Sequence, residues 1–184
     1  MNPQDIQDDE ILRLFREPAT REKGYTILVK KYQEKLYWQI RRMVLSHDDT
    51  DDVLQNVFIK VWNNLDNFQE NSKLFTWLYR IATNESLTFI NQAKKRQSFG
   101  TDSEEFNLSE RLRADPYFEG DEIQIKLQQA ISKLPDKQKQ VFLMRYYDEM
   151  KYEEMSQVLD TSVGALKASY HHAVKKIEKY LTGG

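Results

Sequence analysis

The chain has no cysteine and little glycine or proline. Its 184 residues include 6 glycines and 4 prolines. Without cysteine there can be no disulfide and no thiolate zinc site, and this composition fits a reducing compartment. So few glycines and prolines disfavour the many tight turns of an all-β architecture. We therefore expect a helical protein.

The chain also lacks a long apolar segment and any catalytic signature. There is no run of about 18 apolar residues, and the acidic residues 1–10 do not form a signal peptide. We expect a cytoplasmic protein without direct membrane insertion. There is no Gly-rich phosphate loop, no HExxH motif and no convincing nucleophile–base pair. We therefore expect no enzymatic activity and no cofactor.

The charges that are present are unevenly distributed. The net charge is only −2, which argues against non-specific coating of nucleic acid. Residues 73–97 nevertheless hold five cations against one acid, and residues 162–184 hold four against one. Between them, residues 98–122 hold eight acids against two arginines. Two basic segments joined by an acidic one suggest two nucleic-acid contacts on a tether.

Apolar residues recur at helical spacing in two parts of the chain. The composition, 40% hydrophobic and 12% aromatic, is sufficient for packed cores. The spacing predicts helices over 25–45, from about 50 to 65, over 73–95, and again from about 121 with a break at 134–136. The fold class is all-α, with two small helical domains, a flexible acidic linker and a C-terminal helix-turn-helix. The expected parts are an N-terminal arm or short lead-in helix at 1–22, a helical domain at 23–97, the linker at 98–121 and a second helical domain at 122–184.

The last thirty residues predict the helix-turn-helix. Apolar positions mark a short helix before Asp160 and a longer one from Val163. The opposite face of the longer helix is basic, and a helix-turn-helix presents such a face to a major groove. Its candidate DNA-binding residues are Ser162, Gly164, Lys167, His171, His172 and Lys175. A helical hairpin with a basic rim is the alternative. Adjacent histidines diverge on a helix, so we expect no metal site.

The segment from Asp49 to Trp62, DTDDVLQNVFIKVW, combines an apolar stripe with an acidic and amide patch. Asp52 and Gln55 are three residues apart, so both face outward together. One interpretation is a docking surface for a basic partner protein. The other is an ordinary helix start, where acidic residues favour the helix dipole.

The segment from Asn67 to Asn84 carries an unusual set of side chains. Trp77, Arg80 and Asn84 fall on one helical face at i, i+3 and i+7. An aromatic ring, a guanidinium and an amide can stack on an unpaired base, hold its phosphate and recognise its edge. Phe68 in the preceding loop could support an extruded base. The alternative is that Trp77 is a core residue.

Taken in order, these motifs resemble the extracytoplasmic-function class of bacterial sigma factors. The acidic helix is similar to the family's D-x-x-D-x-x-Q-x-x-F motif. Phe68 to Asn84 is similar to its F-x(8)-T/S-W-L-Y-R-I-A-x-N segment, and Leu134 to Ala173 is similar to its final conserved region. The resemblance covers about residues 20–181.

The resemblance implies partners and roles. The partners are core RNA polymerase, promoter DNA as duplex and as single strand, and, as an option, an anti-sigma factor. The acidic helix would dock on the coiled coil of the largest polymerase subunit. Its residues that would form the docking face, or pack behind that face, are Asp51, Asp52, Gln55, Phe58 and Trp62. The −10 element would be opened and recognised by Phe68, Ser72, Lys73, Trp77, Arg80, Thr83 and Asn84. Residues 162–175 would recognise the −35 element, and 134–147 would lie near the flap of the second large subunit.

Three positions depart from the family pattern. Asp160 stands where glycine is frequent, but aspartate tolerates a left-handed turn better than most residues. Ser156 replaces a frequent alanine, and Ser169 replaces a common arginine, which leaves fewer fixed cations for promoter contact. A stand-alone helix-turn-helix regulator is the main alternative, and it predicts tight duplex binding without polymerase. A helical adaptor that binds only proteins is a third interpretation.

Overall fold

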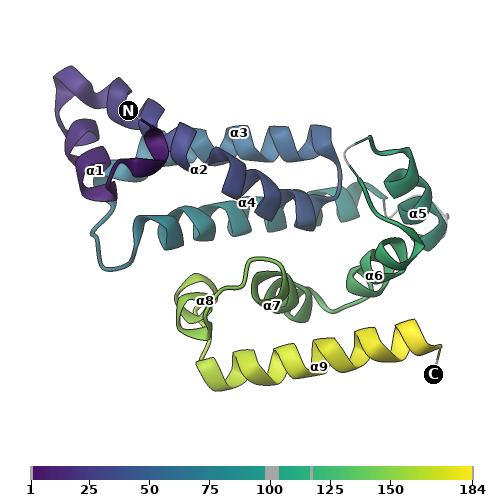
Figure 1. The fold of residues 1–184 in the computed structure, drawn as a ribbon. Coiled ribbons are helices and arrows are strands. Elements are labelled where there is room, and N and C mark those ends of the chain that lie inside the picture. Colours follow the sequence, from purple (N-terminus) through teal and green to yellow (C-terminus); the bar gives the residue numbers. More distant parts are fainter. Residues whose placement is uncertain (1, 98–103, 117, 184) are drawn as a thin grey trace. The chain divides into compact units, whose positions relative to one another are not determined.

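The computed structural model describes residues 2–97, 104–116 and 118–183, and within these ranges the regular structure is entirely helical (Figure 1). The all-α prediction is confirmed. The elements, in chain order, are η1 (Pro3–Asp5), α1 (Asp8–Arg16), η2 (Pro18–Thr20), α2 (Arg21–Val44), α3 (His47–Asn64), η3 (Leu65–Asn67), α4 (Leu74–Gln97), α5 (Glu104–Ala114), α6 (Glu122–Ser132), α7 (Asp136–Tyr146), α8 (Tyr152–Leu159) and α9 (Val163–Thr182). Across the described ranges, every helix falls short of the combined length and hydropathy that a membrane span requires.

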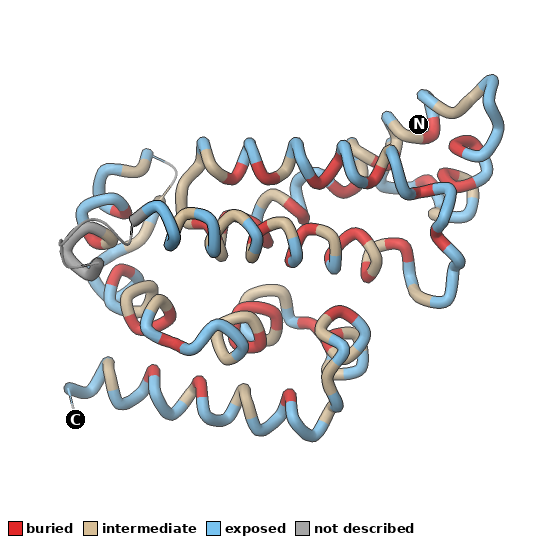
Figure 2. Tube along the Cα trace, turned by 180° about the vertical axis from the view of Figure 1, so that it is seen from behind, coloured by how far each residue is buried: buried red, intermediate tan, exposed pale blue. Residues whose placement is uncertain are grey.

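The chain divides into two compact units. Unit 1 comprises Met1–Val44 and Asp48–Asn91, and unit 2 comprises Leu45–His47 and Gln92–Gly184. In unit 1, the buried residues of α2, α3 and α4 lie on the faces that these helices turn toward one another (Figure 2). Their spacing of three and four residues is that of amphipathic helices around one core. The fully buried aliphatic residues of these helices and of η3 are Leu28, Leu36, Ile40, Val57, Val61, Leu65, Leu78 and Ala82.

The N-terminal segment is a helix and part of that core. Ile11 and Phe15 of α1 have no exposed surface. Helix α1 crosses α2 at Gly24, where an added Cβ would lie only 2.6 Å from the backbone nitrogen of Phe15. The Thr20 hydroxyl donates a hydrogen bond to the Leu14 carbonyl (2.8 Å) and holds the chain between the two helices. Within residues 1–22, Asp8–Arg16 thus forms a helix that packs in the core of unit 1.

A polar contact joins α2 to α4. Gln39 is 2% exposed, and its Nε2 donates to the Thr83 hydroxyl (2.8 Å) and to the Tyr79 carbonyl (3.1 Å). The Thr83 hydroxyl in turn donates to the Tyr79 carbonyl (2.9 Å). These two hydrogen bonds compensate the burial of the Gln39 Nε2 group, so the contact favours one orientation of α4 against α2.

Unit 2 contains the helix-turn-helix and one helix that the sequence does not predict. Asp121 caps α6 through a hydrogen bond from the Gln124 amide (3.0 Å), and Ser162 caps α9 through one from the Ala165 amide (3.2 Å). Helix α5 lies within the segment expected to be a linker. Its Leu112 is buried (3% exposed), and its Arg113 pairs with Glu122 of α6 (2.9 Å) in an exposed ion pair. The burial of Leu112 is therefore the main reason that α5 is ordered.

Candidate nucleic-acid and protein interfaces

Helix α3 presents a polar face to solvent. Asp51, Asp52 and Gln55 are exposed, whereas Val53 and Val57 are buried on the opposite side. The expectation that Asp52 and Gln55 face outward together is confirmed. A buried helix face and an acidic exposed face follow from the same sequence periodicity.

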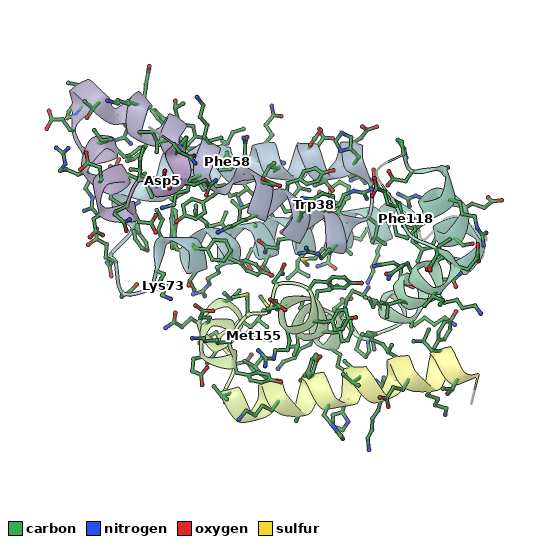
Figure 3. All side chains as sticks on the ribbon, in the orientation of Figure 1. Asp5, Trp38, Phe58, Lys73, Phe118 and Met155 are labelled. Carbon is green, nitrogen blue, oxygen red and sulfur yellow. The ribbon has the colours of Figure 1, made fainter. Side chains whose placement is uncertain are left out.

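Two of the predicted docking residues lie behind this face. Phe58 is 9% exposed, and the Tyr25 hydroxyl donates to its carbonyl (2.8 Å). Figure 3 labels Phe58 on its helix. Trp62 is half-buried, with its ring 4.9 Å from that of Tyr25 and 5.5 Å from that of Phe15. Both side chains support the helix from the core side.

Sequence reasoning did not single out Ile59 on α3. Its side chain is 54% exposed, four residues after Gln55 and seven after Asp52, which places it on the same helix face. A single exposed apolar residue is common on protein surfaces, so Ile59 is of interest only because it shares this face with Asp52 and Gln55. The spacing of four residues from Gln55 could have predicted that Ile59 is exposed. Ile59 directly follows the apolar Phe58, however, and so looks like part of the buried stripe.

Helix α4 carries the second face. Arg80 and Asn84 are exposed one turn apart, and Lys73 is exposed just before the helix (Figure 3). Trp77 is half-buried, and its ring lies 5.4 Å from the ring of Phe68. The face thus joins a cation and an amide to a tryptophan that is neither fully buried nor fully exposed.

Two residues predicted to touch DNA are buried. Phe68 is 5% exposed and belongs to the core cluster of unit 1, and Thr83 is 3% exposed and bonded to Gln39. Ser72 is partly exposed. Thr83 lies six residues after Trp77, which turns it away from the exposed face and toward α2. Direct DNA contact by Phe68 or Thr83 stays a prediction that requires either side chain to leave this packing.

Helix α9 separates a buried stripe from a basic face. Leu166, Ala173 and Ile177 are buried. All the predicted DNA-binding residues of this region are exposed: Ser162, Gly164, Lys167, His171, His172 and Lys175. The Lys167 ammonium lies 5.7 Å from the ring centroid of Tyr152, which links the exposed cation to the start of α8. Within the described residues, no group of three or more His, Cys, Asp or Glu side chains could hold a metal ion.

The turn between α8 and α9 has the geometry that the sequence predicts. Asp160 ends α8 in the left-handed region, with φ 50° and ψ 48°. Thr161 Oγ1 donates to the Leu159 carbonyl (3.0 Å), and Ser162 then caps α9. The expectation that aspartate supports this turn in place of glycine is confirmed.

Two family models match the chain, the first mainly over unit 1 and the second within unit 2. The model described as Sigma-70 region 2 matches residues 28–96, and the one described as Sigma-70, region 4 matches residues 124–177. The first match contains α3 and the exposed face of α4. The second contains the helix-turn-helix and most of α9.

Curated relatives match along most of their length. The ECF RNA polymerase sigma factor SigW of Bacillus subtilis is 32% identical over 168 residues, covering 86% of this chain and 89% of the relative. The ECF RNA polymerase sigma-E factor of Escherichia coli K12 is 30% identical over 165 residues, covering 85% and 86%.

Solved structures share the fold. CnrH in complex with the cytosolic domain of CnrY superposes with a TM-score of 0.69 at 21% identity, covering 96% of this chain and 99% of CnrH. The sigma factor RpoE in complex with the anti-sigma factor NepR from Bartonella quintana gives a TM-score of 0.65 at 19% identity, covering 87% and 98%.

Proposed function

The chain belongs to the extracytoplasmic-function family of RNA polymerase sigma factors, and on this premise we propose how its two units divide promoter recognition between them. Sigma factors are non-enzymatic initiation factors that direct RNA polymerase to promoters. In the proposed division, residues 23–97 bind core polymerase and the −10 element, and residues 122–184 bind the −35 element. Residues 98–121 connect the two.

The polymerase contact is assigned to the exposed face of α3. Asp51, Asp52 and Gln55 supply charge and directional hydrogen bonds, and Ile59 adds apolar surface beside them. This combination suits the coiled coil of the largest polymerase subunit if that surface is basic with an apolar centre. Phe58 and Trp62 do not form this face; they pack against the core of unit 1 and hold α3 in position.

Strand opening is assigned to the face of α4 and the loop before it. Unstacking a base costs a few kcal/mol, and this cost is offset only when the flipped base finds a pocket and a stacking partner. Arg80 and Lys73 can neutralise backbone phosphates, Asn84 can hydrogen-bond a base edge, and Trp77 offers part of its ring for stacking. The exposure of Arg80 and Asn84 beside Trp77 is the single observation that carries this assignment.

The −35 contact is assigned to the basic face of α9. Lys167, His171 and Lys175 recur every four residues on the side opposite the buried stripe, so all three can enter one groove. With Ser169 partly exposed where an arginine is common, affinity for the isolated duplex should be weak. The two contacts then depend on polymerase to hold them on one promoter, which raises the effective concentration of each.

Two further partners belong to the proposal. Residues 134–147 would lie near the flap of the second large subunit. An anti-sigma protein is also included, because RpoE is found in complex with the anti-sigma factor NepR.

A pair of double variants tests the division of labour. Arg80→Ala with Asn84→Ala changes only exposed residues of α4, and Lys167→Ala with Lys175→Ala does the same on α9. The α4 variant, assembled with core polymerase, should lose permanganate reactivity of −10 thymines at least fivefold and keep its dependence on the −35 sequence. The α9 variant should transcribe an intact promoter no better than one with a scrambled −35 element. Indistinguishable defects in the two variants would contradict the proposed division.

A further inference from the structure

The loop between η3 and α4 is held by residues from outside it. Glu70 has a φ of 59°, in the left-handed region that side chains with a Cβ disfavour. The loop, Gln69-Glu70-Asn71-Ser72-Lys73, contains neither glycine nor proline, so its own sequence does not favour this conformation. Something else has to stabilise it.

Arg16, at the end of α1, contacts this loop at two points. Its Nη1 donates to the Glu70 carboxylate (3.0 Å), and its Nη2 donates to the Phe68 carbonyl (3.3 Å). One planar guanidinium therefore bridges a backbone group before the strained residue and the side chain of that residue. In Figure 1 this loop passes beside α1.

A second arginine holds the chain just before the loop. Arg21, at the start of α2, forms a bidentate ion pair with Asp66 of η3: its Nη2 and Nη1 donate to the two carboxylate oxygens (2.6 and 3.1 Å). Its guanidinium also lies 4.0 Å from the ring centroid of Phe15. The Arg21 hydrogen bond lowers the pKa of the Asp66 carboxyl, so Asp66 is ionised and paired near neutral pH.

The backbone at Arg16 is held in place by the packing of α1. Helix α1 lies against α2 at backbone contact distance, because Gly24 leaves no room for a side chain between them. Phe15, next to Arg16, is fully buried. The guanidinium therefore extends from a rigid support rather than from a mobile arm.

We propose that Arg16 is a positioning residue for −10 recognition: it holds the Gln69–Lys73 loop in the conformation that receives an unpaired base. This inference rests on the proposed function of that loop. Helix α1 then contributes to promoter selectivity without touching DNA. Arg21 supports the same loop conformation by holding Asp66, which precedes the loop in the chain.

The test compares Arg16→Ala with Arg13→Ala. Arg13 lies on the same helix but pairs with Glu10 of α1 (2.6 Å). Its replacement by alanine therefore removes one positive charge, as Arg16→Ala does, without removing a contact to the loop. Polymerase holoenzyme carrying each variant is titrated with single-stranded −10 oligonucleotides that differ at one position, for each position in turn. The measured quantity is the ratio of dissociation constants for the worst and the best base at each position. Wild type and Arg13→Ala should have the same ratio. Arg16→Ala should reduce that ratio at least threefold at the captured base, with core-polymerase affinity unchanged.

Two further variants separate positioning by Arg16 from direct base contact by Glu70. Glu70→Gln changes only a surface side chain and should reduce the ratio in the same direction. The double variant Arg16→Ala with Glu70→Gln should have the same ratio as Arg16→Ala alone, because both changes remove the same ion pair. A direct role of Glu70 in base recognition would instead lower the ratio further in the double variant. An unchanged ratio in Arg16→Ala, or a further loss in the double variant, would overturn the inference. Absence of any base preference in the wild-type holoenzyme would instead overturn the proposed function of the loop.

Discussion

Replacing Gly24 by alanine should destabilise unit 1, although alanine is the better helix former. A Cβ at this position would lie 2.6 Å from the Phe15 nitrogen, and 3.0 Å from both the Ile11 oxygen and the Leu14 carbonyl carbon. All three are backbone atoms, so α1 has to move as a whole to make room. Forced backbone shifts of this kind cost about 1–3 kcal/mol, whereas the gain in helix propensity is only about 0.5–1 kcal/mol. We expect a net loss of about 1–2 kcal/mol.

Urea denaturation followed by far-ultraviolet circular dichroism measures this change. A lower midpoint with an unchanged slope would mean that α1 stays docked under strain, and a smaller slope would mean that α1 has detached. Gly164→Ala is the matched control, because no atom lies within 4 Å of its added Cβ. It should leave stability unchanged or raise it by up to about 0.5–1 kcal/mol. The reasoning is refuted if Gly24→Ala is as stable as the wild type.

Three more predictions concern single features. Asp52→Ala with Gln55→Ala should weaken binding to core polymerase about tenfold, or ~1.4 kcal/mol, measured by fluorescence anisotropy, and an unchanged affinity would move the docking face elsewhere. Thr83→Val should lower the free energy of unfolding by about 1–2 kcal/mol, because it leaves its buried glutamine partner on α2 short of an acceptor. A calorimetric scan without a shift would argue against that buried contact. Asp160→Val should cost about 1–2 kcal/mol and Asp160→Gly should not, since only the branched side chain clashes in the left-handed turn. Equal melting temperatures for the two Asp160 variants would contradict the proposed strain.

Long amphipathic helices were predictable because one periodic signal determines both of their faces. In α9 the apolar stripe specifies the buried side, so the exposed side with Lys167, His171 and Lys175 follows directly. The C-terminal turn was predictable for a similar reason. Asp160 and Ser162 are local signals whose geometry does not depend on the rest of the chain.

The features that were missed depend on tertiary contacts. Helix α4 has a second buried side, where Thr83 meets Gln39, and hydrophobic periodicity does not register a buried face made of polar groups. Helix α1 was expected only as an alternative to an N-terminal arm, because its few apolar residues lie among acidic ones. Its close packing on α2 at Gly24 depends on the tertiary fold. Arg16 and Glu70 are more than fifty residues apart in the sequence, so no local sequence pattern predicts their contact.

The proposed function requires that this chain give RNA polymerase a promoter choice that the core enzyme lacks. Run-off transcription of fragmented genomic DNA, with core polymerase alone and with core polymerase plus this protein, tests that most directly. We predict transcripts with discrete start sites only when the protein is present, from templates that share a −35 and a −10 sequence. An identical set of transcripts with and without the protein would contradict the proposed function.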